Sequence, residues 1–171
     1  MTLKRKTPLK RTAWPKNNRK PMNRVSRARA SERRAYAIRR EQYLREHPLC
    51  QAYMARFGID ERLAVAELRE KQEEGMRITT LFYKGRSIPP SMEIHHRNKS
   101  NGERLLNESY WMAVCDWEHA MIERTKDVSR DLGLLCPINA RPDGSLPDGS
   151  RCLTTAELID CRARKIERTT T

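Results

Sequence analysis

Three of the four histidines in the chain lie within one stretch of twenty-five residues. His95 and His96 are adjacent, and His119 follows after a short apolar run. Neutral imidazole is the commonest metal ligand in proteins and a ready general base near pH 7. Glu123 comes four residues after His119, a spacing that places both side chains on one face of a helix. These four residues could therefore bind a metal ion and move a proton within one small unit.

Two short strands are predicted to position the first two histidines. Residues 92–96 alternate loosely between apolar and polar side chains, and residues 110–114 (YWMAV) read as the answering strand. Between them, residues 97–104 are polar and include an Asn-Gly dipeptide, which favours a turn. Because adjacent residues of a strand point to opposite faces, His95 and His96 are expected to have different roles.

Helices are expected to supply most of the remaining structure. Their predicted ranges are 32–46, about 49–57, 61–74, 117–131 and 156–168. Ser31 is expected to cap the first of them, and Asp116 the helix that carries His119 and Glu123. Residues 77–88 combine β-branched and aromatic side chains with Gly85 as a turn signal, which predicts a short hairpin. The predicted fold class is α+β and mostly helical.

The positive charge is concentrated at the N-terminus. The 171 residues have a net charge of +13, and residues 1–30 hold eleven Lys and Arg with no acidic residue. The remaining 141 residues therefore have a net charge of only +2. Dense like charge without apolar periodicity predicts a disordered basic arm that suits a polyanionic partner. Trp14 in this arm could stack on a nucleobase or be an ordinary solvated residue.

Several other classes of protein are not indicated. No apolar run approaches the roughly 20 residues of a membrane span, and no apolar segment follows the basic N-terminus as in a signal peptide. The five cysteines are widely spaced and odd in number, which favours free thiols in a reducing compartment. We therefore expect a cytoplasmic protein without a membrane partner.

The stretch from Glu93 to Glu123 resembles the HNH nuclease family. The similarity rests on three segments, EIHHR at 93–97, GERLLN at 102–107 and WMAVCDWEH at 111–119. Small phage-borne members also begin with a Lys/Arg/Pro-rich arm and a helix leading to a Pro-Leu-Cys turn, here residues 48–50. The resemblance implies a ββα-metal unit, in which a hairpin and a helix surround one divalent ion. The implied organisation is a disordered arm over 1–30, an HNH-like domain over 31–135 with a helical insertion at about 51–91, and a C-terminal loop and helix over 136–171.

The resemblance also implies a role for each candidate residue. His96 would be the general base, His95 and His119 metal ligands, and Glu123 a third ligand. The family more often has His or Asn at the last position, and a carboxylate makes Mg²⁺ or Mn²⁺ more favourable than Zn²⁺ or Ni²⁺. The alternative for Glu123 is a solvated carboxylate that pairs with Lys126 or Arg124.

The sequence departs from the family at the middle Asn. That position falls on Tyr110, whereas Asn107 lies three residues earlier. Either side chain could hydrogen-bond across the loop and fix the His96 ring, and Asn107 is the catalytic candidate of the two.

The two Cys-x-x-Cys pairs of many relatives are also incomplete. Each pair keeps only its first member, Cys50 or Cys115, and two cysteines alone cannot complete a four-ligand zinc site. We expect the structural zinc to be replaced by apolar packing of the aromatic and Met side chains nearby, namely Tyr53, Trp111, Met112 and Trp117.

The function implied is a metal-dependent endonuclease that hydrolyses DNA, with double-stranded DNA favoured. A phage or prophage origin is implied by analogy, which would place the protein in the cytoplasm of a bacterial host cell. Arg97, Lys99 and Arg104 are expected to hold the DNA backbone together with the arm. The alternatives are a non-catalytic nucleic-acid-binding protein with a degenerate HNH scaffold, and a basic structural protein of a ribonucleoprotein.

Overall fold

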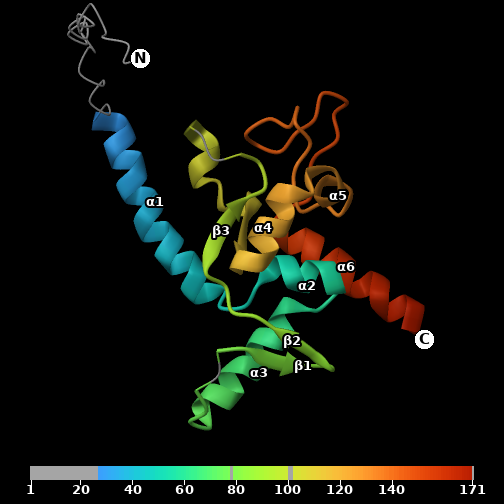
Figure 1. Ribbon diagram of the computed structural model, residues 1–171. Coiled ribbons are helices and arrows are strands. Elements are labelled where there is room, and N and C mark those ends of the chain that lie inside the picture. Colours follow the sequence, from blue (N-terminus) through green and yellow to red (C-terminus); the bar gives the residue numbers. More distant parts are fainter. Residues whose placement is uncertain (1–26, 78, 100–101, 171) are drawn as a thin grey trace, which may run out of the picture.

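The computed structural model describes residues 27–77, 79–99 and 102–170 (Figure 1). Residues 1–26 of the expected disordered arm therefore lie outside the described residues. Its last four residues are helical, because α1 spans Arg27–Glu46. Residues 27–30 are Arg and Ala, which are strong helix formers, so the helix starts before Ser31 and that residue does not cap it.

The other elements alternate helices with two short hairpins, and the α+β class is confirmed. In chain order they are α2 (Gln51–Phe57), α3 (Glu61–Glu73), β1 (Leu81–Tyr83), β2 (Arg86–Ile88), β3 (Glu93–His96), the 3-10 turns η1 (Gly102–Leu106) and η2 (Glu108–Tyr110), β4 (Trp111–Val114), α4 (Asp116–Arg124), α5 (Lys126–Asp131) and α6 (Thr155–Thr170).

The hairpin β3–β4 lies at the centre of the molecule. The two strands are antiparallel, and His95 stands opposite Met112 while His96 stands opposite Trp111. Every residue of β4 is buried. Trp111 and Ala113 pack with Ile94 against Tyr43 of α1.

The other face of β4 meets the helices α2 and α6. Met112 and Val114 belong to the largest buried cluster, which contains residues of α2 and α6 such as Ala52, Ala55 and Ile159. A strand covered on both faces needs apolar side chains at every position, which explains the sequence WMAV. The hairpin that carries His95 and His96 is therefore held from both sides.

The segment from α3 to β2 forms a second, smaller core. Leu68, Leu81 and Ile88 pack together with Leu49, which precedes α2, and with Met54, which lies in α2. Asp60 caps α3 by accepting hydrogen bonds from two backbone amides. Figure 1 shows this segment at the end of the molecule away from α5.

The helix predicted over 117–131 is broken into two. α4 ends at Arg124, and α5 begins at Lys126. The Thr125 hydroxyl donates to the Met121 carbonyl, and its backbone leaves the helical region (φ −117°, ψ 57°). The break turns the chain directly after Glu123. At the other end, the N-cap of α4 is Cys115 rather than Asp116.

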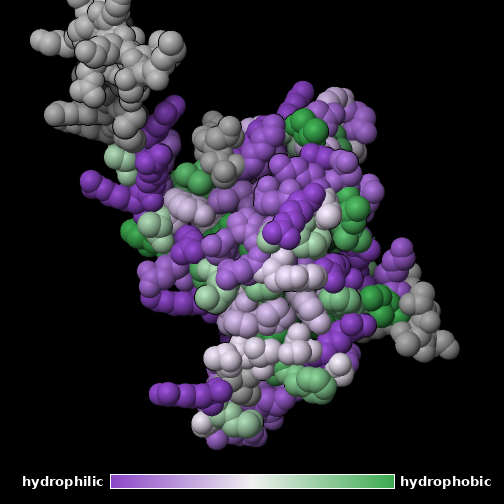
Figure 2. All heavy atoms as spheres, in the orientation of Figure 1, coloured by the Kyte–Doolittle hydropathy of each residue, from purple (hydrophilic) through white to green (hydrophobic). Residues whose placement is uncertain are grey.

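The face of the molecule in Figure 2 is mainly hydrophilic, and its hydrophobic residues are scattered. Among the described residues, no helix combines the length and apolar character needed to cross a bilayer.

Candidate metal centre

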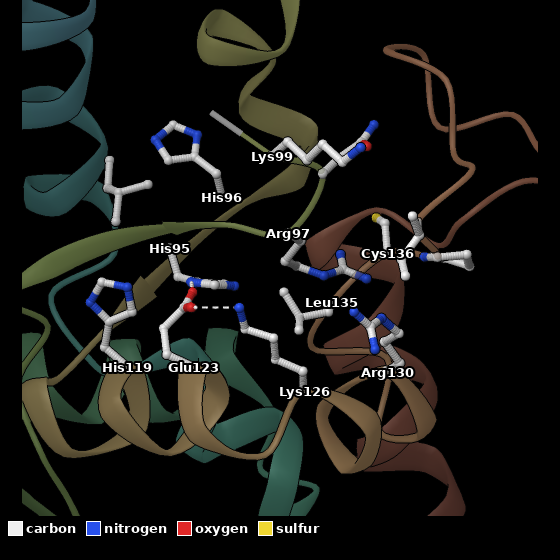
Figure 3. Close-up of a pocket in the computed structure, with 14 residues that line it drawn as sticks. His95, His96, Arg97, Lys99, His119, Glu123, Lys126, Arg130, Leu135 and Cys136 are labelled. Atoms are coloured by element: carbon white, nitrogen blue, oxygen red, sulfur yellow. Dashed lines mark ion pairs between the residues drawn. The ribbon is translucent and has the colours of Figure 1, made fainter. Parts of the chain in front are cut away.

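Three predicted ligands converge beside β3. His95, His119 and Glu123 each offer a ligand atom, and these atoms lie within 4.8 Å of one another. Figure 3 shows His95 directed from the strand toward the two side chains of α4. Two ligands each about 2.1 Å from one ion can lie no more than about 4.2 Å apart. A shift of a few tenths of an ångström, which exposed Glu123 could supply, would bring the set into range.

Local structure accounts for this convergence. His95 comes from a strand position whose side chain is buried, with only 4 % of its surface exposed. His119 and Glu123 lie one turn apart on α4, so both project from the face that meets β3. In the part of the chain that the structure describes, this is the one cluster of three or more His, Cys, Asp or Glu residues close enough to hold an ion.

A fourth residue, Glu93, completes the surroundings of His119. Its carboxylate Oε2 lies 2.6 Å from His119 Nδ1. A histidine that ligates a metal commonly donates its other ring N–H to a carboxylate, which fixes the ring and leaves the second nitrogen free. This role of Glu93 was not predicted from the sequence, although the alternation of side chains along β3 indicates it. Glu93 and His95 lie two apart and share one side of the strand.

Both expectations for Glu123 have a counterpart in the structure. Its Oε1 lies 3.9 Å from His95 Nδ1, and its Oε2 lies 3.6 Å from Lys126 Nζ. The side chain is half exposed, so the ion pair with Lys126 is weak and leaves the carboxylate available.

His96 projects from the opposite side of β3, as alternation predicts (Figure 3). Its Nε2 lies 3.0 Å from the Tyr36 hydroxyl of α1, and its ring stands edge-on to Trp111 with centroids 5.7 Å apart. Its Nδ1 is buried and has no hydrogen-bond partner. His96 nevertheless lines the same pocket of about 440 Å³ as His95, His119 and Glu123.

Burial keeps both strand histidines neutral at pH 7. It lowers the pKa of His95 to about 3, and the positive charges of His119, His96 and Arg97 add to this effect. It lowers the pKa of His96 to about 4, with His119 adding to it. A neutral ring carries the lone pair needed to ligate a metal or to accept a proton.

Neither candidate for the middle Asn is hydrogen-bonded to His96. Asn107 accepts from the Ser109 amide and donates to the Pro142 carbonyl, and the Tyr110 hydroxyl donates to the Asp143 carbonyl. The 3-10 turns between the strands direct both side chains toward the loop that precedes α6. We expected one of them to hydrogen-bond the His96 ring, but neither does. The Tyr36 hydroxyl makes the hydrogen bond to this ring instead.

Two of the three basic residues expected to contact DNA are engaged within the fold. Arg97 is buried, and its guanidinium donates to the Gly133 carbonyl and the Thr155 hydroxyl. Arg104 donates to the Ala140 carbonyl. Arg97 still lines the pocket beside the histidines, together with Lys126, Arg130 and exposed Lys99.

An ion pair and a thiol contact surround Cys50 and Cys115, the two cysteines left of the pairs that the resemblance implies. The Cys115 amide donates to Cys50 Sγ at 3.3 Å, and both thiols are buried. One helical turn on, the fully buried Glu118 accepts two hydrogen bonds from Arg56 of α2. Tyr53 and Met112 pack nearby as expected. Trp117 does not, because it is 61 % exposed and lies against the Arg56 guanidinium. Trp111 does not either, because it packs in the separate cluster with Tyr43.

Comparisons of the chain with models of protein families, with curated proteins and with solved structures find no match in any of the three. The functional assignment therefore depends on the residues and their geometry.

Proposed function

We propose that the chain is a metal-dependent endonuclease of the HNH type that hydrolyses phosphodiester bonds in DNA. The observation that carries the proposal is that the two histidines of β3 face opposite sides of the strand. His95 faces His119 and Glu123 on one side of the strand, His96 lies on the other side, and all four line one pocket. The order of hairpin and helix matches the ββα unit that the sequence resemblance implies.

The residues present fit a divalent cation. The pocket offers two imidazoles and one carboxylate, and Glu93 is placed to hold His119 in the ligand orientation. The buried His95 Nε2 has no hydrogen-bond partner, so this ring lacks a competing role within the fold. The carboxylate makes Mg²⁺ or Mn²⁺ the favoured ion, with Zn²⁺ or Ni²⁺ also compatible with imidazole. When bound, such an ion supplies charge neutralisation at the phosphate and at the leaving oxygen.

His96 is the residue that accepts a proton from the attacking water. Its Nε2 is hydrogen-bonded to Tyr36, and Nδ1 can receive the proton when Nε2–H is the donor in that bond. Nδ1 is covered in this conformation, and a water has to enter the pocket beside it before the step.

The cations of the pocket would hold the phosphate. Lys126 and Arg130 follow Glu123 around the break between α4 and α5, and both line the pocket. Exposed arginines continue along α1, among them Arg33 and Arg34, in the direction of the basic arm. Such contacts give affinity for DNA without sequence preference and weaken as salt increases.

A plasmid cleavage assay tests the proposal. We expect the protein to nick or cut plasmid DNA with Mn²⁺ or Mg²⁺, to lose this activity with a chelator, and to lose at least about 100-fold in rate on His96→Ala. His47→Gln is the matched control, because His47 contacts Glu61 and Gln51 away from the site. Activity that survives both the chelator and His96→Ala would overturn the proposal.

A second candidate function, a non-catalytic nucleic-acid-binding protein with a degenerate HNH scaffold, is favoured by one observation. Asn107 is turned away from His96 toward the loop before α6. DNA binding without cleavage at any of the four metals would select this function.

A further inference from the structure

His96 is held by an aromatic cluster to which three elements contribute. Tyr36 of α1 lies with its ring centroid 5.4 Å from the His96 ring, and it stands edge-on to Trp111 of β4 at 5.3 Å. Trp111 is fully buried, and its indole N–H donates to the Leu105 carbonyl. The cluster fixes the plane of the His96 ring, and the Tyr36 hydroxyl lies 3.0 Å from its Nε2.

The hydrogen bond between Tyr36 and His96 could run in either direction. If the hydroxyl donates to Nε2, the proton of a neutral ring is on Nδ1. If Nε2–H donates to the hydroxyl oxygen, Nδ1 carries the lone pair. Nδ1 is buried without a partner. A buried N–H without an acceptor costs more than a lone pair without a donor, and buried N–H groups without partners are rare.

We infer that Tyr36 is a positioning residue that holds His96 in the Nε2–H tautomer, with the lone pair on Nδ1. Its hydroxyl oxygen accepts the Nε2 proton, and its own hydroxyl proton is left to point elsewhere. The inference rests on the proposed function for its catalytic consequence, because Nδ1 then is the nitrogen able to accept a proton from water.

The position of Tyr36 gives this role to α1, an element outside the hairpin and helix that carry the other site residues. The Tyr36 hydroxyl of α1 contacts His96 of β3, and Arg40 of α1 donates to the carbonyl of Met92, the residue before β3. The same helix leads directly from the basic N-terminal segment. Removal of one hydroxyl on α1 is therefore expected to change the state of a histidine sixty residues away in the sequence.

Nitrogen NMR of the full chain, labelled with ¹⁵N-histidine, tests the inference without metal or DNA. The four histidines are assigned with His96→Gln. The two ring nitrogens of a neutral histidine differ strongly in chemical shift, so the protonated nitrogen is read directly. We expect His96 to be the Nε2–H tautomer in the wild type and a mixture of the two tautomers in Tyr36→Phe, because neither ring nitrogen then has a partner. Tyr43→Phe is the matched control. It removes a hydroxyl from the same helix, but that hydroxyl donates to Gln51 and to the Trp111 carbonyl and not to His96.

Cleavage kinetics add the catalytic part. We expect Tyr36→Phe to lower kcat about tenfold with little change in KM for DNA. An Nδ1–H tautomer in the wild type, or a tautomer that Tyr36→Phe leaves unchanged, would overturn the inference whatever the cleavage rate. A tautomer that responds to Tyr36→Phe in a protein that cleaves no DNA would support the positioning role and overturn the nuclease function. Equal changes in Tyr36→Phe and Tyr43→Phe would indicate a general loss of packing and overturn the role of the hydroxyl.

Discussion

The described residues form two antiparallel hairpins, and the residues of the proposed site belong to one of them. β1 and β2 are joined by the two-residue turn Lys84–Gly85, and one side of β1 is open to solvent, with Phe82 68 % exposed. β3 and β4 are joined by a long connection over residues 97–110, and β4 is buried at every position. The local hairpin is specified by its turn, whereas the central one depends on the helices that cover it.

The difference shows what a hairpin needs in order to hold several site residues in place. The hairpin of β1 and β2 packs against its small core through Leu81, Tyr83 and Ile88 only. Side chains on β3 are fixed because α1 packs on one face of the hairpin and α2 with α6 on the other. A site held within a few tenths of an ångström needs such support from surrounding elements.

The largest expected difference between the hairpins is the cost of removing a large aromatic side chain. Trp111→Ala in β4 removes a fully buried ring and should lower the free energy of unfolding by about 3–5 kcal/mol. Phe82→Ala in β1 removes an exposed ring and should change it by no more than about 0.5 kcal/mol. Urea unfolding at pH 7 measures both. Similar losses would mean that the two hairpins are supported alike.

A second comparison concerns two ion pairs on the helices around the hairpins. One joins α2 and α4, and the other lies within α3. Arg56→Met leaves the fully buried Glu118 without its partner and should cost about 3 kcal/mol at pH 7. Lys71→Met breaks the partly exposed pair with Glu67 on α3 and should cost about 0.3–0.5 kcal/mol. The double variant Arg56→Met/Glu118→Gln should recover most of the larger loss.

The loss in Arg56→Met should also depend on pH. Burial raises the pKa of Glu118, and Arg56 opposes this shift. A carboxyl whose pKa is raised on folding contributes stability below its unfolded pKa, and this contribution is lost as pH rises through the folded pKa. Without Arg56 the pKa rises further, so the deficit relative to wild type should shrink from pH 7 to pH 5. A deficit that grows on acidification would contradict the assignment.

Metal binding should slow amide hydrogen exchange in the central hairpin and leave the exchange rates of the other hairpin unchanged. At an Mn²⁺ concentration of about 100 Kd, binding stabilises the folded state by about 2.7 kcal/mol, or about 100-fold in exchange rate. Amides of β3, β4 and α4 should slow by up to this factor, because their opening releases the ion. Amides of β1 and β2 that exchange by local opening should keep their rates. His95→Ala should abolish the effect, and uniform slowing in that variant would contradict the site.

The sequence predicts the local features of both hairpins. It also predicts that the two adjacent histidines lie on opposite faces of their strand. The Gly85 turn, the strand pair around His95 and His96, and the return of His119 on a helix all follow from residue types within short windows. These signals are local, so no knowledge of distant contacts is needed.

The contacts of the site that come from distant elements could not be predicted in this way. Nothing in the sequence around Tyr36 indicates a contact with the site, and its hydrogen bond to His96 joins residues sixty apart. Arg97 reads as a phosphate contact because it is charged and beside the histidines, but it folds inward to Gly133 and Thr155. A side chain with five donors bonds whichever carbonyls the tertiary fold presents, which composition does not reveal.

The smallest expected effect is confined to the turn of the local hairpin. Lys84 and Gly85 both have positive φ, 46° and 75°, as a two-residue turn between twisted strands requires. Lysine is strained at such a position, whereas Asn tolerates it, so Lys84→Asn should stabilise the protein by about 0.5 kcal/mol. Gly85→Ala should destabilise it by about 1 kcal/mol through backbone strain alone, because a Cβ there meets no atom within 4 Å. Urea unfolding measures both variants, and His95-dependent Mn²⁺ binding should stay unchanged because the turn is outside the central hairpin. A change in Mn²⁺ affinity in either variant would show that the two hairpins are coupled, and the contrast between them would then have to be abandoned.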